Sequence, residues 1–149
     1  MDFNGSSHND NLKGYSLGVG GVVVCENRIL LVRKACGRFA GCWTIPGGYV
    51  EPNELIEHAV VRETREEANV NATVDELVLI RNRITGGGEE NSIYVVFKMR
   101  TSDPHPQPDG SEIAEARYFT EDEIQELSVV LPLCHLAIDK ALNNGQPLI

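Results

Sequence analysis

Three glutamates stand close together near the middle of this chain: Glu63, Glu66 and Glu67. In a helix, residues at i, i+3 and i+4 share one face, because each residue turns the chain by about 100°. The apolar residues of the same segment fall on that face as well: Leu55, Ile56, Ala59 and Val60. This distribution predicts that the three carboxylates lie on the inward side of the helix, beside the core.

Carboxylates gathered on an inward face need a positive partner. Like charges at these spacings destabilise a helix by about 0.2–0.5 kcal/mol per pair, and burial adds to that cost. On the same helical wheel Arg62 points away from the cluster, and the solvent face holds Glu54, Glu57, His58 and Arg65. We therefore predict a hard divalent cation. Mg²⁺ is favoured because it binds through few protein carboxylates together with substrate phosphate, and Mn²⁺ is the alternative.

The helix that carries these glutamates should run from about Glu54 to Ala68. Asn53 is of a type that caps helix N-termini, and an acidic residue in the first turn complements the helix dipole. Asn69 tolerates the left-handed backbone conformation that ends many helices. The sequence therefore predicts one amphipathic helix between these two asparagines.

Apolar runs on either side of this helix predict strands over residues 17–25, 28–32, 74–83, 93–100 and 115–119. Glycines and Pro46 make residues 34–48 a predicted loop, and three consecutive glycines make residues 85–92 a predicted mobile link. Two helices should close the chain. Thr120 and Glu123 form a capping box for the first, over residues 120–127, and the second covers residues 131–143.

A chain of 149 residues fits one domain with a sizeable core. We expect residues 1–14 to form a flexible arm and residues 15–149 to form that domain. The formal net charge of −9 disfavours duplex nucleic acid and anionic membrane as partners, and no apolar run is long enough to span a bilayer. Four cysteines without a C-x-x-C pair predict reduced thiols in a cytoplasmic protein and no zinc site.

The spacing around the glutamates resembles the Nudix box. That box reads glycine, five residues, Glu, seven residues, Arg-Glu, an aliphatic residue, any residue, Glu-Glu, any residue, glycine and an aliphatic residue. The residues that stand at those intervals here are Gly48, Glu54, Arg62, Glu63, Glu66, Glu67 and Val70. The flanking segments agree too, so the likeness extends over most of the chain.

Two positions depart from the box. Thr64 replaces the first aliphatic residue and keeps its β-branching, so the packing should change little. Asn69 replaces the second glycine and is the next-best residue at a left-handed helix end. Neither change removes a chemical group from the box.

The resemblance implies both a fold and a reaction. Nudix proteins are α/β proteins, with an α/β/α sandwich around a mixed sheet. They hydrolyse a phosphoanhydride bond in a nucleoside diphosphate linked to another group. By this likeness Glu63, Glu66, Glu67 and the Gly47 carbonyl would bind Mg²⁺, which polarises phosphoryl oxygens and acidifies the attacking water. Arg62 would hold a box glutamate in place.

Nudix proteins often take their general base from a loop outside the box. Glu112 is the first choice here because it precedes the predicted strand over residues 115–119 by a suitable interval. Glu115 is the second choice and Glu66 the third.

Four arginines are candidates for contacts with the substrate. Arg33 and Arg38 flank the loop before the box, and Arg81 and Arg83 share one face of a predicted strand. Trp43 is more consistent with a core position than with stacking on a base.

Two functions fit this sequence. The first is a metal-dependent pyrophosphohydrolase, and the second is a module of the same fold that senses a nucleotide or ADP-ribose without cleaving it. The complete glutamate set favours the enzyme. Its substrate stays open among nucleoside triphosphates, ADP-ribose, sugar nucleotides and similar compounds, although Gly86 stands where ADP-ribose-type members tend to carry proline. Many Nudix proteins are homodimers, so a homodimer is a further expectation from the resemblance.

Overall fold

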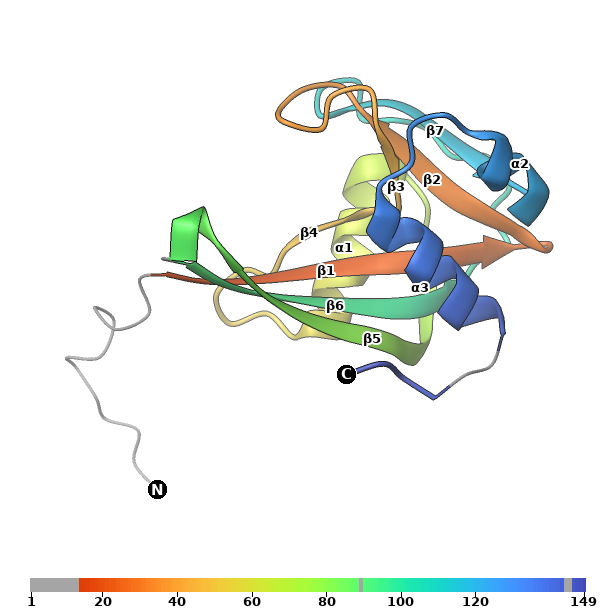
Figure 1. Ribbon diagram of the computed structural model, residues 1–149. Helices are drawn as coiled ribbons and strands as arrows, with labels where there is room; N and C mark the ends of the chain where they lie inside the picture. Colours follow the sequence, from red (N-terminus) through yellow and green to blue (C-terminus); the bar gives the residue numbers. More distant parts are fainter. Residues whose placement is uncertain (1–13, 89, 144–145) are drawn as a thin grey trace.

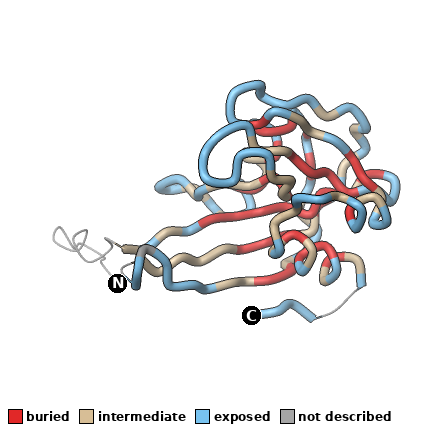
Figure 2. Tube along the Cα trace, turned by 45° about the horizontal axis from the view of Figure 1, so that its top comes forward, coloured by how far each residue is buried: buried red, intermediate tan, exposed pale blue. Residues whose placement is uncertain are grey.

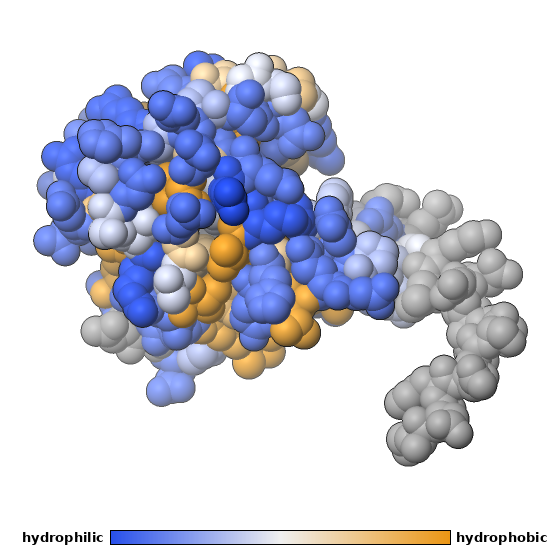
Figure 3. All heavy atoms as spheres, turned by 180° about the vertical axis from the view of Figure 1, so that it is seen from behind, coloured by the Kyte–Doolittle hydropathy of each residue, from blue (hydrophilic) through white to orange (hydrophobic). Residues whose placement is uncertain are grey.

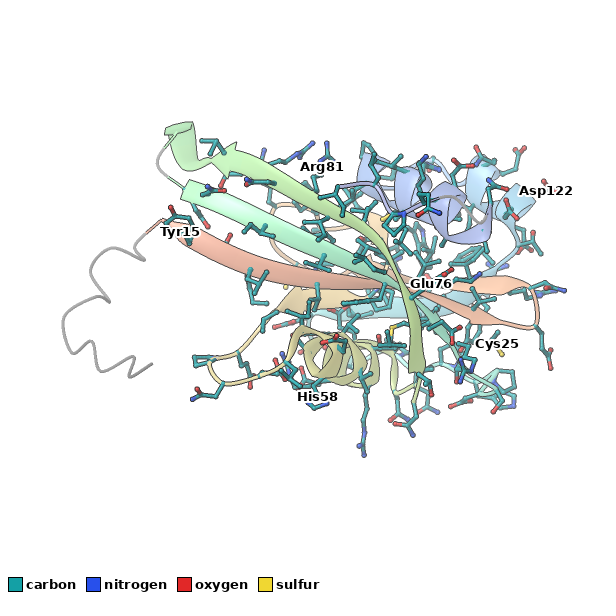
Figure 4. All side chains as sticks on the ribbon, turned by 90° about the horizontal axis from the view of Figure 1, so that it is seen from below. Tyr15, Cys25, His58, Glu76, Arg81 and Asp122 are labelled. Atoms are coloured by element: carbon teal, nitrogen blue, oxygen red, sulfur yellow. The ribbon has the colours of Figure 1, made fainter. Side chains whose placement is uncertain are left out.

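The computed structural model describes residues 14–88, 90–143 and 146–149. The flexible arm predicted for residues 1–14 lies outside the described residues, apart from Gly14. Three layers are visible in Figure 1: a mixed sheet carries α1 (Ile56–Ala68) on one face and α3 (Pro132–Leu142) on the other. Figure 4, seen from below, places His58 on the outer side of α1 and Arg81 on the opposite side of the sheet. The predicted α/β/α sandwich is confirmed.

Seven strands form the sheet within the described residues. They are β1 (Tyr15–Cys25), β2 (Arg28–Lys34), β3 (Trp43–Thr44), β4 (Gly47–Tyr49), β5 (Thr73–Thr85), β6 (Glu90–Arg100) and β7 (Ile113–Phe119). The main order is β3-β2-β1-β6-β5, with β4 paired to β1 and β7 paired to β2. Only the β1–β6 pair is parallel among these described pairs, which makes the sheet mixed.

The central strands supply both cores, because alternate residues of a strand face opposite sides of the sheet. On one side Val19 and Val23 join Val60 of α1 in a buried cluster. On the other side Val22 belongs to a cluster with Ala137 of α3. Figure 2 shows this buried layer along the middle strands. The sheet therefore packs α1 against one face and α3 against the other.

The strands are longer, and the loops shorter, than predicted. β5 and β6 extend to Thr85 and from Glu90, and a 3-10 turn over Gly86–Gly88 lies between them. The predicted loop over residues 34–48 contains β3 and most of β4. Glycine and proline are uncommon in strands, so the local sequence did not indicate β3 and β4. These strands form through tertiary pairing with β2 and β1. The strand predicted over residues 115–119 is confirmed and begins earlier, at Ile113.

The start of α1 differs from the prediction. Asn53 does not cap the helix: it takes a φ of 63° in the preceding turn, and Leu55 is the N-cap without a side-chain hydrogen bond. Leu55 is also 62% exposed, so it does not extend the apolar face. The turn is closed by the Glu54 N–H, which donates to the Glu51 carbonyl at 3.2 Å. A local turn therefore displaced the predicted cap.

The other helix ends follow the sequence closely. Asn69 adopts the left-handed conformation (φ 54°, ψ 34°), and its N–H donates to the Arg65 carbonyl. Thr120 and Glu123 form the predicted capping box at α2 (Glu121–Glu126). In α3 a proline occupies the first turn, where its missing N–H costs nothing.

The surface on the α1 side is mostly hydrophilic, with scattered hydrophobic side chains between polar ones (Figure 3). Within the described part of the chain, no helix combines the length and apolar character needed to cross a membrane.

Candidate active site

Two of the three predicted glutamates pack between α1 and β4. Glu67 is only 3% exposed, and the side chain of Glu63 is 14% exposed. A Cβ atom at Gly48 would lie 2.5 Å from the Glu63 carboxyl group, closer than real side-chain contacts allow. Gly48 therefore lets the strand approach the carboxylate directly.

The third glutamate is oriented differently from the prediction. The Glu66 side chain is 58% exposed, so the prediction that all three carboxylates face inward is wrong for this residue. On the helical wheel Glu66 lies at the edge of the apolar face, and its side chain extends into solvent there. Glu66 consequently stands at the mouth of the site, beside the two buried carboxylates.

Arg62 binds the cluster from the side, contrary to the wheel. Its guanidinium donates from Nη1 to Glu63 Oε1 at 2.8 Å and to Glu66 Oε2 at 3.2 Å. It also donates from Nη2 to the Tyr49 carbonyl at 3.0 Å and from Nε to Glu54 Oε2 at 2.7 Å. The wheel fixes only the direction of the Cα–Cβ bond, and the long arginine side chain turns back along the helix surface. Glu54 is thus drawn into the site and away from the predicted solvent face.

Burial raises the pKa of two glutamates in the site, and hydrogen bonds from Arg62 lower the pKa of a third. Burial raises the pKa of Glu67 to about 8, although the Lys34 ammonium partly offsets this. Burial also raises the pKa of Glu63, against the hydrogen bond from Arg62. The hydrogen bonds from Arg62 lower the pKa of Glu54 to about 2. Burial therefore disfavours the ionised form of Glu63 and Glu67 despite their basic neighbours, whereas two hydrogen bonds from Arg62 stabilise ionised Glu54.

The donor set suits a hard divalent cation. It offers carboxylate oxygens from Glu63, Glu66 and Glu67 beside the Gly47–Gly48 backbone, and no sulfur or imidazole ligand among them. A cation would supply the positive charge that buried Glu63 and Glu67 lack. Among the described residues, no group of three or more His, Cys, Asp or Glu side chains is already placed to hold a metal ion. Arg62 contacts the Glu66 carboxylate at 3.2 Å, and the Glu66 side chain is 58% exposed.

Glu112 lies within electrostatic range of the buried acids. Its negative charge raises the pKa of both Glu63 and Glu67. Its carbonyl accepts a hydrogen bond from the Ala35 N–H at 2.8 Å, which ties its loop to the end of β2. The second choice of base, Glu115, forms an ion pair with Arg33 at 3.2 Å instead. Of these two glutamates, only Glu112 contributes to the raised pKa of Glu63 and Glu67.

A cavity of about 410 Å³ opens on the other face of the sheet, beside α3. Two predicted substrate contacts, Arg81 and Arg83, line it together with Phe39 and Tyr94. The tyrosine hydroxyl lies against the backbone of β1 and β4: a Cβ at Gly20 or Gly47 would meet it at 2.3 or 2.8 Å. Burial raises the pKa of Tyr94, and the charges of Glu67 and Glu63 add to this shift. Tyr94 therefore joins the cavity to Gly47, the residue beside the buried Glu67.

The other two predicted arginines, Arg33 and Arg38, lie near aromatic rings. Arg33 lies 6.0 Å from the Trp43 ring centre and is paired with Glu115. Arg38 lies over the Phe39 ring at 5.4 Å, at the rim of the cavity. Trp43 packs edge-on against Phe119, which confirms its predicted core position.

Sequence reasoning missed Phe39 and Tyr94 as cavity residues. A signal for the tyrosine existed: Gly18 and Gly20 alternate along β1 and leave one face of that strand without side chains. A large residue on the neighbouring strand fills such a space, and Gly18 pairs with Tyr94. No comparable pattern pointed to Phe39, which lies in an irregular loop.

Residues 14–134 match the NUDIX domain family, and this match covers most of the chain. The chain belongs to the NUDIX family. The predicted resemblance is therefore confirmed, and the acidic cluster on α1 is the NUDIX box.

Relatives and solved structures support this membership. An ADP-ribose pyrophosphatase of Methanocaldococcus jannaschii is 29% identical over 113 residues, which are 76% of this chain and 66% of that protein. A MutT-like protein of Streptomyces ambofaciens is 34% identical over 113 residues, 75% of this chain and 68% of that protein. The matches span about two thirds of each relative. A NUDIX hydrolase structure from Nitrosomonas europaea superimposes with a TM-score of 0.74 at 28% identity, covering 90% of this chain and 78% of that one.

The two departures from the NUDIX box are absorbed locally. Thr64 is fully buried, and its hydroxyl donates to the Val60 carbonyl at 2.8 Å, one turn earlier in α1. Its polar group is therefore satisfied without disturbing the core. Asn69 adopts the left-handed conformation at the end of α1, with its N–H bonded to the Arg65 carbonyl.

Proposed function

We propose that this protein is a metal-dependent hydrolase that cleaves a phosphoanhydride bond in a nucleoside diphosphate linked to another group. The observation that carries this proposal is the pair Glu63 and Glu67. Both carboxylates are buried against the Gly47–Gly48 strand, and burial raises the pKa of both. Such a pair is costly to keep ionised without a cation.

Glu63, Glu66, Glu67 and the Gly47 carbonyl are the proposed ligands. A divalent ion held by them supplies positive charge to the phosphate oxygens and lowers the pKa of an attacking water. Arg62 keeps Glu63 and Glu66 in place, because its Nη1 contacts both carboxylates. Its charge also favours the ionised form of Glu63. This arginine therefore acts on the ligands and does not contact the substrate.

Glu112 is the proposed general base. It approaches the acidic cluster from a different element than α1, so its carboxylate can accept a proton from water on the substrate side. Lys34 lies near Glu67 on the same side and supplies positive charge for a phosphate. Glu115 is less suited to the role, because Arg33 already binds it.

The cavity beside α3 is proposed to hold the nucleoside. Its volume of about 410 Å³ lies in the range of small-molecule pockets. Tyr94 and Phe39 offer aromatic surface for a base, and Arg81 and Arg83 offer donors for its polar edge or for an anionic group. The nucleoside would then lie on one face of the sheet and the pyrophosphate at the edge, beside β4.

The alternative is a sensing module of the same fold. A module that only binds its ligand gains nothing from two buried carboxylates whose pKa values are raised by burial, because ionising them lowers its stability. The relatives named as an ADP-ribose pyrophosphatase and a MutT-like protein also favour an enzyme. Their names differ, so the substrate class is proposed only as nucleotide-linked diphosphates.

A substrate panel tests this proposal. The purified protein is incubated with Mg²⁺ or Mn²⁺ and nucleoside triphosphates, ADP-ribose, NADH, sugar nucleotides or dinucleoside polyphosphates, and released phosphate and pyrophosphate are measured. We expect turnover of at least one compound and none in EDTA. Binding of Mg²⁺ without turnover of any compound would support the sensing module instead.

A further inference from the structure

The loop before β7 is organised around one exposed carboxylate. Asp109 Oδ1 accepts hydrogen bonds from the Ser111 N–H at 2.8 Å and from the Ile113 N–H at 2.9 Å. Gly110 adopts a φ of +78° between them, and its N–H donates to the Ile113 carbonyl at 3.2 Å. The loop therefore closes on itself through a single side chain.

In the sequence, Glu112 lies between Ser111 and Ile113, whose N–H groups both donate to Asp109. Burial disfavours the ionised form of Asp109, but hydrogen bonds from the Ile113, Ser111 and Glu112 N–H groups outweigh it and lower the pKa of Asp109. The carbonyl of Glu112 is fixed from the other side by the Ala35 N–H at 2.8 Å. Both peptide groups of Glu112 are thus restrained, on a loop from which its charge adds to the raised pKa of Glu63 and Glu67.

The two restraints differ in kind. The bond from Ala35 joins two backbone groups and would survive any side-chain substitution in the loop. The bonds to Asp109 depend on one carboxylate that is itself exposed and contributes no core packing. Asp109 is therefore placed where a substitution can release Glu112 without unfolding the sheet.

We propose that Asp109 is a positioning residue that holds Glu112 in the geometry needed for proton abstraction. This inference rests on the proposed function of Glu112 as the general base. Asp109 lies outside the NUDIX box and does not contact the proposed metal ligands. A misplacement of about 1 Å in a catalytic group costs up to about 100-fold in rate, so a released loop should lower kcat far more than KM.

Three variants separate loop geometry from charge. Asp109→Ala removes the acceptor, and Asp109→Asn keeps Oδ1 as an acceptor while removing the charge that lies near Lys34. Asp103→Ala is the matched control, because Asp103 Oδ1 accepts the His105 N–H at 2.9 Å in a similar turn of the same connection. Each is assayed with Mg²⁺ and the panel compound that the wild-type enzyme cleaves fastest.

We expect Asp109→Ala to lower kcat by about 10- to 100-fold with KM changed less than about threefold. Asp109→Asn should stay within about threefold of the wild type, and Asp103→Ala should match the wild type. In a Glu112→Gln background, Asp109→Ala should cause little further loss, because the two residues act as a unit. Circular dichroism and thermal melts establish that each variant is folded.

Several outcomes would overturn the inference. Equal losses in Asp109→Ala and Asp109→Asn would mean that the charge, and not the loop geometry, is what acts. A loss of the same size in the Glu112→Gln background would show that Asp109 acts independently of Glu112. If Glu112→Gln alone keeps wild-type kcat, the general-base assignment fails and the positioning role fails with it. A folded Asp109→Ala with wild-type kcat refutes the positioning role alone.

Discussion

Arg62 donates two hydrogen bonds to the carboxylate of Glu54, from Nε to Oε2 at 2.7 Å and from Nη2 to Oε1 at 3.0 Å. The pair joins the turn before α1 to the middle of that helix. The same guanidinium reaches Glu63 and Glu66. A bidentate arginine fixes both position and orientation, so Glu54 sets where Arg62 presents its remaining donors to the cluster.

Replacement of this carboxylate should make stability less sensitive to acid. The pKa of Glu54 in the folded protein is about 2, below its ordinary value of 4.5, because Arg62 donates to it. A depressed pKa stabilises the fold above pH 4.5, and that contribution is lost as the pH falls toward 2. Glu54→Gln should therefore lower the unfolding midpoint at pH 7, and the difference from wild type should shrink between pH 5 and 3. Thermal melts across this range measure it, with exposed Glu57→Gln as the control. Parallel curves at all pH values would contradict the prediction.

Glu67 should have the opposite pH dependence in metal-free protein. Burial raises its pKa to about 8 in the folded state. The stability associated with its protonated form is complete below pH 4.5 and is lost as the pH rises through 8. In EDTA, Glu67→Gln should therefore be more stable than wild type at pH 8, by on the order of a few kcal/mol, and similar at pH 4.5. Urea unfolding at the two pH values measures this. A variant that is less stable at pH 8 would disprove the raised pKa.

Gly48→Ala should impair the site more than the fold. The new methyl group would overlap the Glu63 carboxyl at 2.5 Å, and the end of that side chain would have to move. We expect kcat to fall at least about tenfold with a small change in melting temperature. Gly21→Ala is the matched control, because its Cβ would meet the Met99 sulfur at 2.5 Å inside the core. That control should lower stability and leave kcat per folded molecule unchanged. The same pattern in both variants would contradict the assignment.

Glu66→Gln should abolish most metal-dependent turnover while the fold stays intact. Glu66 is largely exposed and makes only a rim contact with Arg62, so its removal costs little packing. As a proposed ligand, its charge is needed for the cation, and we expect a loss of at least about 100-fold in kcat. Isothermal titration with Mn²⁺ should show weakened binding, and Glu57→Gln should behave like wild type. Wild-type turnover by Glu66→Gln would remove this residue from the ligand set.

Arg81→Ala should affect substrate affinity more than chemistry. Arg81 lines the cavity with Tyr94 and lies on the sheet face opposite α1. If the cavity holds the nucleoside, loss of the Arg81 side chain removes an interaction that is equally strong in the bound substrate and in the transition state. KM should therefore rise about tenfold, with kcat within about threefold. Arg65→Ala, on the exposed side of α1, is the control. A fall in kcat at unchanged KM would place the nucleoside elsewhere.

The chemistry of the site was readable from the sequence because it is local. The spacing of Glu63, Glu66 and Glu67 places them within two turns of one helix, and helical periodicity alone relates them to its apolar face. The left-handed end at Asn69 and the capping box at Thr120 are also local, since each depends on a few neighbouring residues. Resemblance to the NUDIX box then extended this local pattern to a family.

Only the tertiary structure decided which carboxylates are buried and what surrounds them. The Glu66 side chain is largely exposed, and the Arg62 side chain turns back to donate hydrogen bonds to Glu54 and the Tyr49 carbonyl, which lie earlier in the chain. Tyr94 lies against Gly18 and Gly20 of β1, and Glu112, in the loop before β7, adds to the raised pKa of Glu67. These relations join residues far apart in sequence, and strand pairing and burial determine them. Periodicity records only the direction in which each side chain leaves the backbone.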